Sequence, residues 1–440
     1  MRLIKELKIE KLVYKGYGLA YHDDKTIFVQ HAYPGDVVDT KVIFEKGKIR
    51  FAEVETILSS SNRRIKSQCE AFGKCGGCDW LTLKYEHQLE AKQIIIDEIF
   101  SHLAPRTDFI SSSKDIHHYR NKTFMPLTES GGDIKIGMFA KQSHQVIPHK
   151  TCRLHPEIFD KIAEDFVRYC YAAKVPIYDE QKHTGAVRHL GFRMNTAGEI
   201  IMVVVTKTRK MPFTKQLVRM IGEKYDNVVG IVQNINPKPG NTILGDDEKI
   251  LMGKPDFIEI IDDVKYKLNY NSFFQINAGV AADLYAYIKA QITPQKTVLD
   301  AYCGVGAIGI YTADKAEKII GIEQNEQALQ DARISAELNG LNNTEFLSGD
   351  VEAEIEKVLS SQLIDTIIFD PPRKGLTSKL IDLIAKYNIP HLIYVSCNPM
   401  SQFRDCQILI ENGYQVTKRK AFDMFPHTYH IENVVIMDRA

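Results

Sequence analysis

The chain has 440 residues, too long for one ordinary hydrophobic core, so two or three domains are expected. Hydrophobic residues make up 44% and charged residues 25%, the composition of a soluble globular protein, and no apolar run reaches the length of a membrane span. The formal net charge is zero, so charge alone neither indicates nor excludes a nucleic acid partner.

The N-terminal segment MRLIKELKIEKL alternates charged with apolar residues. It contains neither the uninterrupted apolar segment nor the small-residue cleavage site of a signal peptide. We therefore expect a cytoplasmic protein with no membrane partner. In that compartment, the eight cysteines are expected to be thiols or metal ligands rather than disulfides.

Residues 1–60 favour short strands. Apolar and polar residues alternate in short runs between residues 26 and 58. The turn-forming residues Pro34-Gly35-Asp36 and Gly47 separate these runs. The pattern predicts a small OB-like β-barrel over residues 1–60. Such barrels include RNA-binding modules and modules that only pack, and the pattern leaves both alternatives open.

The segment CEAFGKCGGCDW places Cys69, Cys75 and Cys78 close together, and its two adjacent glycines allow a tight turn on which thiolates converge. A four-coordinate metal site or an iron-sulfur cluster would need a fourth ligand besides these three. The candidate fourth is Cys152, because Cys170 lies in a helical pattern and is interpreted as buried core. A clustered triad with one distant cysteine favours a [4Fe-4S] cluster; zinc and free structural thiols are the alternatives.

The stretch from Cys152 to about residue 265 carries no chemically specific motif. It combines an amphipathic helical pattern, strand-like runs such as EIIMVVVTK, and turns such as NPKPGN. We expect residues 61–265 to form a central α+β domain that holds the iron-sulfur site.

Residues 266–440 alternate short apolar runs with helical patterns. Helices with glycine C-caps are expected at 325–340 and 401–413, and strands at 296–306, 318–323, 344–350, 365–372, 391–399, 414–422 and 432–439. Near-continuously apolar strands separated by helices predict a parallel sheet covered on both faces. The last two strands have no helix between them, so they should form an antiparallel hairpin at one edge.

Ligands bind at the carboxyl ends of the strands in such a sheet. Gly304 and Gly306 follow the first strand, where the absence of a side chain lets the backbone approach a ligand closely. Glu323 ends the second strand, at a position where an acid can accept hydrogen bonds from ribose hydroxyls. Because Gly309 completes a GxGxxG pattern, a dinucleotide-binding fold remains an alternative at this point.

The other strand ends discriminate between these alternatives. Asp350 and Asp370 follow the third and fourth strands, and Cys397 ends the fifth. Hydride transfer has no use for this thiol, whereas methylation of uracil C5 does: a thiolate that adds to C6 makes C5 nucleophilic, and a base must then remove the C5 proton. Glu432 is the candidate base, with His430 as its competitor.

Each of these residues has an ordinary structural explanation when taken alone. A cysteine at a strand end is commonly a buried hydrophobe, which is how we interpret Cys303 and Cys406. Asp350 can cap a helix, and Glu432 can be solvated or paired. The location of four such residues at strand ends of one sheet favours a catalytic site.

The chain resembles the RNA 5-methyluridine methyltransferases of the TrmA/RumA type along nearly its whole length. The N-terminal barrel resembles a TRAM domain, and the CxxxxxCGGC run with its distant cysteine resembles that family's iron-sulfur motif. Five further segments resemble its catalytic motifs: SFFQINAG, DAYCGVG, DPPRKG, SCNP and HIENV.

The resemblance implies a Rossmann-like class I methyltransferase domain at 266–440 that uses S-adenosylmethionine. Cys397 would be the nucleophile and Glu432 the base. The cluster ligands would be Cys69, Cys75, Cys78 and Cys152. The cofactor pocket would comprise Gln275, Tyr302, Gly304, Gly306, Glu323, Asp350 and Asp370, with Asp370 also near the target ring.

The implied substrate is a uridine in folded RNA, flipped out of its stack to reach the thiol. Three-domain, cluster-containing members of the family act on large-subunit ribosomal RNA, which favours 23S rRNA over tRNA; no obligate protein partner is expected. The cluster is expected to be structural.

Two other functions remain as alternatives. Pro372 gives DPPR where relatives often have a small residue, which brings this loop nearer to that of amino-methyltransferases. A non-catalytic iron-sulfur RNA-binding protein is the alternative of a different class, although it would not need to retain the thiol, the base and the cofactor acids.

Overall fold

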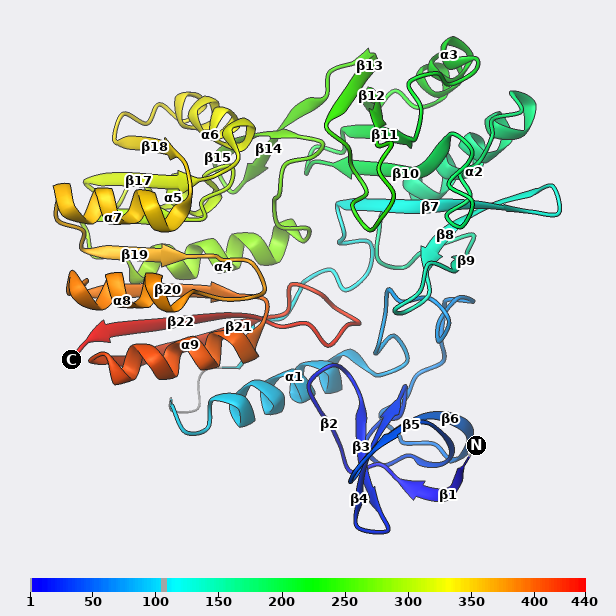
Figure 1. Cartoon of the computed structure of the whole chain (residues 1–440), viewed down its shortest axis with the longest axis horizontal. Helices are drawn as coiled ribbons and strands as arrows, with labels where there is room; N and C mark the ends of the chain where they lie inside the picture. The colour runs from blue at the N-terminus through cyan, green and yellow to red at the C-terminus, as the bar shows by residue number, and fades with distance from the viewer. Residues whose placement is uncertain (1, 104–108) are drawn as a thin grey trace.

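The computed structural model describes residues 2–103 and 109–440. Three regions, each built on its own large sheet, surround a common centre (Figure 1). The N-terminal strands, drawn in blue, lie below the central sheet, and the C-terminal sheet lies beside both. No helix among the described residues is both long enough and apolar enough to cross a membrane.

The N-terminal region, which we call the N-terminal barrel, is a curled six-stranded sheet in the order β1-β5-β6-β4-β3-β2. The expected run of short strands is present. Its inner face is aliphatic, with Ile27, Val29 and Ala52 fully buried. The strands are β1 (Leu3–Lys8), β2 (Lys11–Leu12), β3 (Gly18–His22), β4 (Lys25–Gln30), β5 (Val37–Lys46) and β6 (Ile49–Ser59).

The central region is a seven-stranded, mostly antiparallel sheet with two helices on one face. Its other face carries Val203, Val205 and Val232, which share a core with the C-terminal region. The elements are β7 (Lys122–Ser130), β8 (Asp133–Phe139), β9 (Val146–Pro148), α2 (Glu157–Ala172), β10 (Val187–Met194), β11 (Ile200–Thr206), α3 (Thr214–Lys224), β12 (Val228–Ile235) and β13 (Asp247–Gly253).

The C-terminal sheet has the order β18-β17-β16-β19-β20-β22-β21, and all of its pairings are parallel except those of β22. The predicted parallel sheet and edge hairpin are therefore confirmed, with β21 outermost. The strands are β16 (Thr297–Ala301), β17 (Lys318–Glu323), β18 (Thr344–Ser348), β19 (Thr366–Phe369), β20 (His391–Ser396), β21 (Tyr414–Phe422) and β22 (Glu432–Arg439).

Helices cover both faces of this sheet, as expected. The two helices predicted from the sequence correspond to α6 (Glu326–Leu338) and α9 (Pro399–Glu411). Helices α4 (Ala278–Gln291) and α5 (Ala307–Thr312) pack with α6 on one face, and α7 (Val351–Ser361) and α8 (Ser378–Lys386) pack with α9 on the other.

Helix α1 (Tyr85–Phe100) joins the cysteine-rich segment to the C-terminal sheet. It lies beside α9 (Figure 1). Its Ile95 and Phe100, with the preceding Trp80, share one buried core with Leu299 and Tyr394 of the sheet. Residues next to the cysteine motif are therefore packed against the sheet that carries Cys397.

A two-stranded hairpin leads into the C-terminal region. It consists of β14 (Asp256–Ile261) and β15 (Val264–Asn269), and it docks on α6, where the Lys267 backbone N–H donates to the Ser335 hydroxyl at 2.9 Å. The hairpin directs the following segment, residues 270–277, toward the carboxyl ends of the sheet strands.

Candidate active site

A cleft of about 1500 Å³ opens at the carboxyl ends of β16, β17, β19 and β20. It is larger than an ordinary small-molecule pocket of roughly 300–1,000 Å³, so it has room for a cofactor and a nucleotide together. Residues of the central sheet and of the cysteine-rich segment also line it. Of the residues predicted from the sequence, it is lined by Gln275, Tyr302, Gly304, Glu323, Asp350, Asp370, Cys397, His430 and Glu432.

The loop after β16 exposes its backbone to this cleft. Tyr302 and Gly304 both have positive φ angles, 65° and 55°. A Cβ atom on Gly304 would meet open space, so the cleft reaches the backbone directly there. The Glu323 carboxylate orders this edge by accepting the backbone N–H groups of Gly304 at 3.2 Å and Asn325 at 2.9 Å.

Gly306 does not line the cleft with the rest of its loop. A Cβ there would lie 2.9 Å from Ile310 and 3.2 Å from Phe346, and the φ of 74° also favours glycine. Gly306 therefore allows α5 to start close to the sheet, which is a packing role rather than a ligand contact.

Two polar residues picked out by the sequence motifs cap helices. Asp350 is the N-cap of α7 and accepts the Ala353 backbone N–H at 3.1 Å, while it also lines the cleft. Asn277 caps α4 and is buried away from the cleft. Gln275, two residues earlier, is 6% exposed and does line the cleft.

The neighbouring phenylalanines differ in environment. Phe274 is buried in the core between α4 and the β14–β15 hairpin. Phe273 is 72% exposed and projects at the cleft wall. A large apolar ring that lies in solvent beside a nucleotide-sized cleft offers a stacking surface.

Cys397 lies immediately after β20, at the cleft edge of the sheet. Burial, together with the nearby Glu432 carboxyl, raises the pKa of its thiol to about 11. The positive charge of the Arg373 guanidinium acts in the opposite direction and lowers the pKa of the thiol. Arg373 is thus the cation placed to stabilise a thiolate at this position.

Glu432 begins β22 and is only 2% exposed. Burial and the neighbouring Asp370 raise its pKa well above its usual value, and burial raises the pKa of Asp370 to about 7. Each of the two carboxyls therefore keeps its proton to a higher pH than a solvated carboxyl does. His430 is the weaker base, because burial lowers its pKa to about 4.

The loop before Glu432 is held by buried polar contacts from α1. The Lys92 ammonium donates to the Asp423 carboxylate at 2.5 Å, and both side chains are fully buried. The Tyr85 hydroxyl donates to the same carboxylate at 2.8 Å. Gln88 accepts the His427 backbone N–H at 2.9 Å. These contacts fix the path of the chain as it enters β22.

The four predicted cluster cysteines line one smaller cavity between the cysteine-rich segment and the central region. Each thiolate would raise the pKa of others, and burial raises the pKa of Cys75 to about 11 and that of Cys78 well above its usual value. The sulfurs of Cys75 and Cys152 accept the backbone N–H groups of Gly77 at 3.3 Å and Leu154 at 3.4 Å. At Cys152 the neighbouring His155 outweighs burial and lowers the pKa of the thiol.

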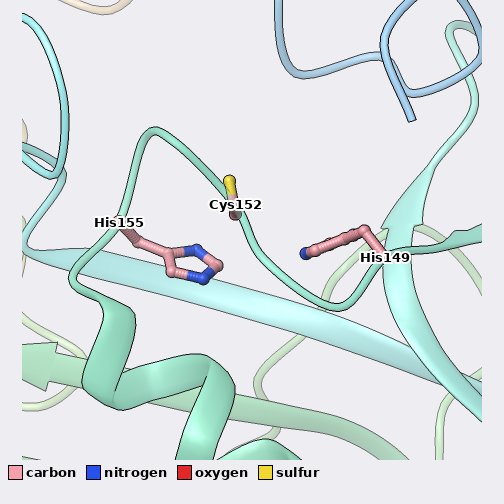
Figure 2. Close-up of side chains that lie close together, drawn as sticks. All are labelled: His149, Cys152 and His155. Carbon is pink, nitrogen blue, oxygen red and sulfur yellow. The ribbon is translucent and has the colours of Figure 1, made fainter. Parts of the chain in front are cut away.

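Two histidines flank Cys152. Figure 2 shows His149, just after β9, and His155, just before α2, on either side of the Cys152 thiol. Their ligand atoms lie within 4.8 Å of one another. His155 is already engaged, because its Nε2 lies 2.8 Å from the Asp160 carboxylate.

The remaining cysteines match their expected structural role. Cys170 and Cys406 are fully buried, and Cys303 is 7% exposed. Each belongs to a hydrophobic core cluster.

The family model for tRNA (uracil-5-)-methyltransferase matches residues 246–440. An RNA methyltransferase of Bacillus cereus is 34% identical over 99% of this chain and 96% of its own length, and one of Listeria monocytogenes is 36% identical over 98% and 97%. The chain belongs to the same RNA methyltransferase family as these relatives. It is an RNA (uracil-5-)-methyltransferase.

A solved member of this methyltransferase family has the same fold over the whole chain. The tRNA (uracil-54, C5)-methyltransferase of Pyrococcus abyssi, solved in complex with S-adenosyl-L-homocysteine, is 27% identical. The two structures match with a TM-score of 0.80, over 98% of this chain and 99% of the other. The similarity includes the N-terminal barrel and the central sheet as well as the methyltransferase sheet.

Sequence reasoning missed two groups of cleft residues in this RNA (uracil-5-)-methyltransferase. Arg373 stood in the sequence only as a member of the DPPR motif with no role assigned, yet its charge lowers the pKa of Cys397. The central-sheet residues Lys122, Phe124 and His189 also line the cleft and carry no motif. Of these cleft residues, only Arg373 lies in a recognisable sequence motif, DPPR, from which a place in the cleft could have been predicted.

Proposed function

We propose that this enzyme methylates C5 of a uridine in 23S rRNA, with S-adenosylmethionine as the methyl donor. The observation that carries the proposal is the position of Cys397, Arg373 and Glu432 together in one cleft at the carboxyl edge of the sheet. A nucleophile, a cation that stabilises its thiolate and a buried carboxyl are the groups that C5 methylation requires.

The proposed reaction has three steps. The Cys397 thiolate adds to C6 of the uracil ring, which converts the ring into an enolate. C5 of the enolate attacks the sulfonium methyl group, so a C–C bond forms, the methyl–sulfur bond breaks, and S-adenosylhomocysteine leaves. Glu432 then accepts the C5 proton, the C6–sulfur bond breaks, and the thiolate is released. The raised pKa of Glu432 makes it a stronger base than a solvated carboxylate.

We assign the methyl donor to the half of the cleft beside β16 and β17. Gly304 lets it approach the backbone, and Glu323 is placed to accept hydrogen bonds from its ribose hydroxyls. Gln275, Tyr302, Asp350 and Asp370 line the same cleft. The target ring would enter from the side of Cys397, Phe273 and Glu432, which requires it to leave its stack.

The outer face of the N-terminal barrel supports a role in RNA binding. Phe28, Phe51 and Phe44 lie on adjacent strands β4, β6 and β5, outside the aliphatic interior. The Phe28 and Phe51 rings stack with centroids 5.2 Å apart, and Tyr17 lies 5.4 Å from Phe51. Aromatic rings on the outside of a barrel are suited to stack on unpaired bases.

A cation connects this aromatic face to the catalytic cleft. The Lys141 ammonium lies 5.4 Å from the Tyr17 ring and 5.9 Å from the ring of Tyr429, which lines the cleft. We propose that residues 1–60 bind RNA and that residues 61–265 add further RNA contacts and hold the cluster. Residues 266–440 would carry out methylation.

We further propose that Cys69, Cys75, Cys78 and Cys152 hold a [4Fe-4S] cluster with a structural role. The four side chains line one cavity, which supports a single centre shared by all four. Four cysteine thiolates are the usual ligand set of a [4Fe-4S] cluster, and a tetrahedral zinc ion could also take four. A mononuclear site of His149, Cys152 and His155 is the competing arrangement, and the two exclude each other because they share Cys152.

Metal analysis separates the two arrangements. The cluster predicts that Cys75→Ser loses iron and the charge-transfer absorbance of anaerobically purified protein, whereas His149→Ala keeps both. The mononuclear site predicts the reverse dependence, with zinc in place of iron. If Cys75→Ser loses iron yet keeps its folding and its RNA affinity, the structural role is wrong.

tRNA is the second candidate substrate. The Pyrococcus abyssi enzyme, named for a tRNA uridine, matches this chain over its whole length. The architecture of barrel, central sheet and methyltransferase sheet therefore does not by itself select ribosomal RNA.

A covalent trapping experiment tests both the chemistry and the substrate. The protein and S-adenosylmethionine are incubated with 23S rRNA fragments or tRNA transcripts that contain 5-fluorouridine, which cannot release its C5 substituent as a proton. We expect a denaturation-stable protein–RNA adduct with 23S rRNA that Cys397→Ala abolishes and Cys406→Ala retains. An adduct with tRNA alone would replace the substrate, and methylation by Cys397→Ala would refute the mechanism.

A further inference from the structure

The turn between β2 and β3 places the N-terminal barrel against Asp79 and Tyr429, two residues that line the catalytic cleft. The turn is closed by the Gly16 backbone N–H, which donates to the Val13 carbonyl at 3.0 Å. Gly16 has a φ of 85°, and a Cβ there would lie 3.2 Å from Asp79 and 3.3 Å from Tyr429. Its carbonyl accepts the Trp80 indole N–H at 3.1 Å. The turn is therefore wedged against both the cysteine-rich segment and the loop before Glu432.

Tyr14, at the tip of this turn, contacts the residue next to the proposed nucleophile. Its hydroxyl donates to the Asn398 side-chain carbonyl at 3.0 Å, across 384 residues of sequence. Its ring packs edge-on against Tyr429, with centroids 5.8 Å apart and an interplanar angle of 87°. The ring is half-buried between the two contacts.

Asn398 departs from the usual behaviour of asparagine at its position. It is the N-cap residue of α9, where an asparagine side chain normally accepts a backbone N–H of the first turn, but it makes no such bond. Its amide N–H donates instead to the Arg373 carbonyl at 2.8 Å. That bond fixes the orientation of the amide, so its oxygen faces Tyr14. The Asn398 side chain therefore bonds to Tyr14 and Arg373, two residues distant in sequence, instead of capping its own helix.

Arg373 completes the connection, because Arg373 and Cys397 line the same cleft and the guanidinium charge lowers the pKa of the thiol. We infer that Tyr14 is a positioning residue for the nucleophile: through Asn398 it holds the backbone of Arg373, and thereby the cation beside Cys397. The inference rests on the proposed role of Cys397 and goes beyond a role of the barrel in RNA binding. The barrel completes the active site of the methyltransferase sheet.

The protonation state of Tyr14 suits this role. Burial raises the pKa of the Tyr14 hydroxyl to about 12, so the hydroxyl remains a donor at the pH of the reaction. Loss of one such hydrogen bond between neutral groups changes a rate or an equilibrium by about three- to tenfold. Because the ring makes the packing contacts, Tyr14→Phe removes only the hydrogen bond and leaves the turn in place.

The test compares Tyr14→Phe with Tyr21→Phe, a control on the exposed face of the same barrel. We expect Tyr14→Phe to slow single-turnover adduct formation with 5-fluorouridine RNA by about three- to tenfold at unchanged RNA affinity. The pH midpoint for alkylation of Cys397 by iodoacetamide without RNA, followed by peptide mass spectrometry, should rise. Tyr21→Phe should match the wild type in all three measurements.

A double-mutant cycle tests the path through Asn398. Asn398→Ala alone should slow adduct formation at least as much as Tyr14→Phe, and the double variant should be no slower than Asn398→Ala. Additive effects would show that Tyr14 acts by another route and would overturn the inference. A second result would also overturn the inference. In it, Tyr14→Phe loses RNA affinity, but its rate of adduct formation at saturating RNA and its pH midpoint for Cys397 alkylation stay unchanged.

Failure of this inference is distinguishable from failure of the proposed function. If Cys397→Ala still methylates RNA, the nucleophile assignment fails and the cycle has no meaning. If Cys397→Ala is inactive and Tyr14→Phe behaves as wild type, only the positioning role of Tyr14 is wrong.

Discussion

The buried ion pair between Lys92 and Asp423 makes a quantitative prediction about the loop that leads to Glu432. Both side chains are fully buried, 331 residues apart in sequence, and join α1 to the end of β21. Lys92→Met keeps the apolar length of the side chain and removes the charge. It leaves the Asp423 carboxylate buried, with the Tyr85 hydroxyl as its remaining side-chain donor.

The expected loss of stability is large. Removal of one partner of a buried ion pair costs about 3–5 kcal/mol, because the other charge stays buried without compensation. The hydrogen bond from Tyr85 offsets about 1 kcal/mol of that, so we expect a loss of roughly 2–4 kcal/mol. The double variant Lys92→Met/Asp423→Asn should recover most of the loss, because no charge then remains buried.

The protein contains its own probe for this measurement. Trp80 is the only tryptophan in the chain, is fully buried, and has the Lys92 ammonium 5.9 Å from its ring. Urea unfolding followed by its fluorescence therefore reports on the junction that the ion pair stabilises. Lys161→Met, at an exposed position of α2, is the matched control and should change stability by less than about 0.5 kcal/mol.

Two results would refute this reasoning. One is a loss below about 1 kcal/mol for Lys92→Met, which is the size expected of a solvated pair. The other is a double variant less stable than Lys92→Met, which would mean that Asp423 has other compensating partners. At urea concentrations below the transition, Lys92→Met should also release methylated RNA more slowly, because the loop before Glu432 is less well held.

Three further predictions concern single side chains. Glu432→Gln should accumulate a methylated covalent adduct with unmodified RNA, because the C5 proton is no longer removed. The adduct should be visible on denaturing gels when the methyl group is labelled. Release of methylated RNA at the wild-type rate would contradict this prediction. Arg373→Gln should raise the pH midpoint of Cys397 alkylation by about one unit, because the thiolate loses about 1.4 kcal/mol of charge stabilisation at a partly solvated site. Lys374→Gln is the control. Equal midpoints for Arg373→Gln and the wild type would exclude Arg373 as the stabilising cation. Asp300 is buried with a pKa raised to about 7, so folding favours its protonated form and wild-type stability falls as pH rises from about 4 through 7. Asp300→Asn lacks this loss and should gain roughly 2–4 kcal/mol relative to wild type between pH 4 and pH 8, measured by urea unfolding; parallel pH profiles would contradict it.

Local patterns in the sequence were sufficient to predict the architecture of the methyltransferase sheet. Apolar runs separated by helical patterns predict parallel strands, and the carboxyl ends of parallel strands meet at one edge. For that reason Glu323, Asp370 and Cys397 were expected in one pocket, and the structure brings them together. The alternation of residues in the first sixty positions likewise predicted strands, because side chains in a strand point to opposite faces in turn.

The same patterns could not separate residues that share a motif but face different surroundings. Gly304 faces the cleft, whereas Gly306 packs against Phe346. Gln275 lines the cleft, whereas Asn277 caps a helix. The distinction depends on which element packs against each residue, and that is decided outside the motif.

Contacts across hundreds of residues were decided only by the tertiary structure. Tyr14 meets Asn398, and Lys92 meets Asp423, because α1 and the N-terminal barrel pack against the sheet that carries Cys397. The periodicity of a sequence records which face of each element is apolar, but not which partner covers that face. The sequence by itself thus determined the strands, the helices and the reactive residues at their ends, whereas packing between the three regions decided which distant side chains hold them in place.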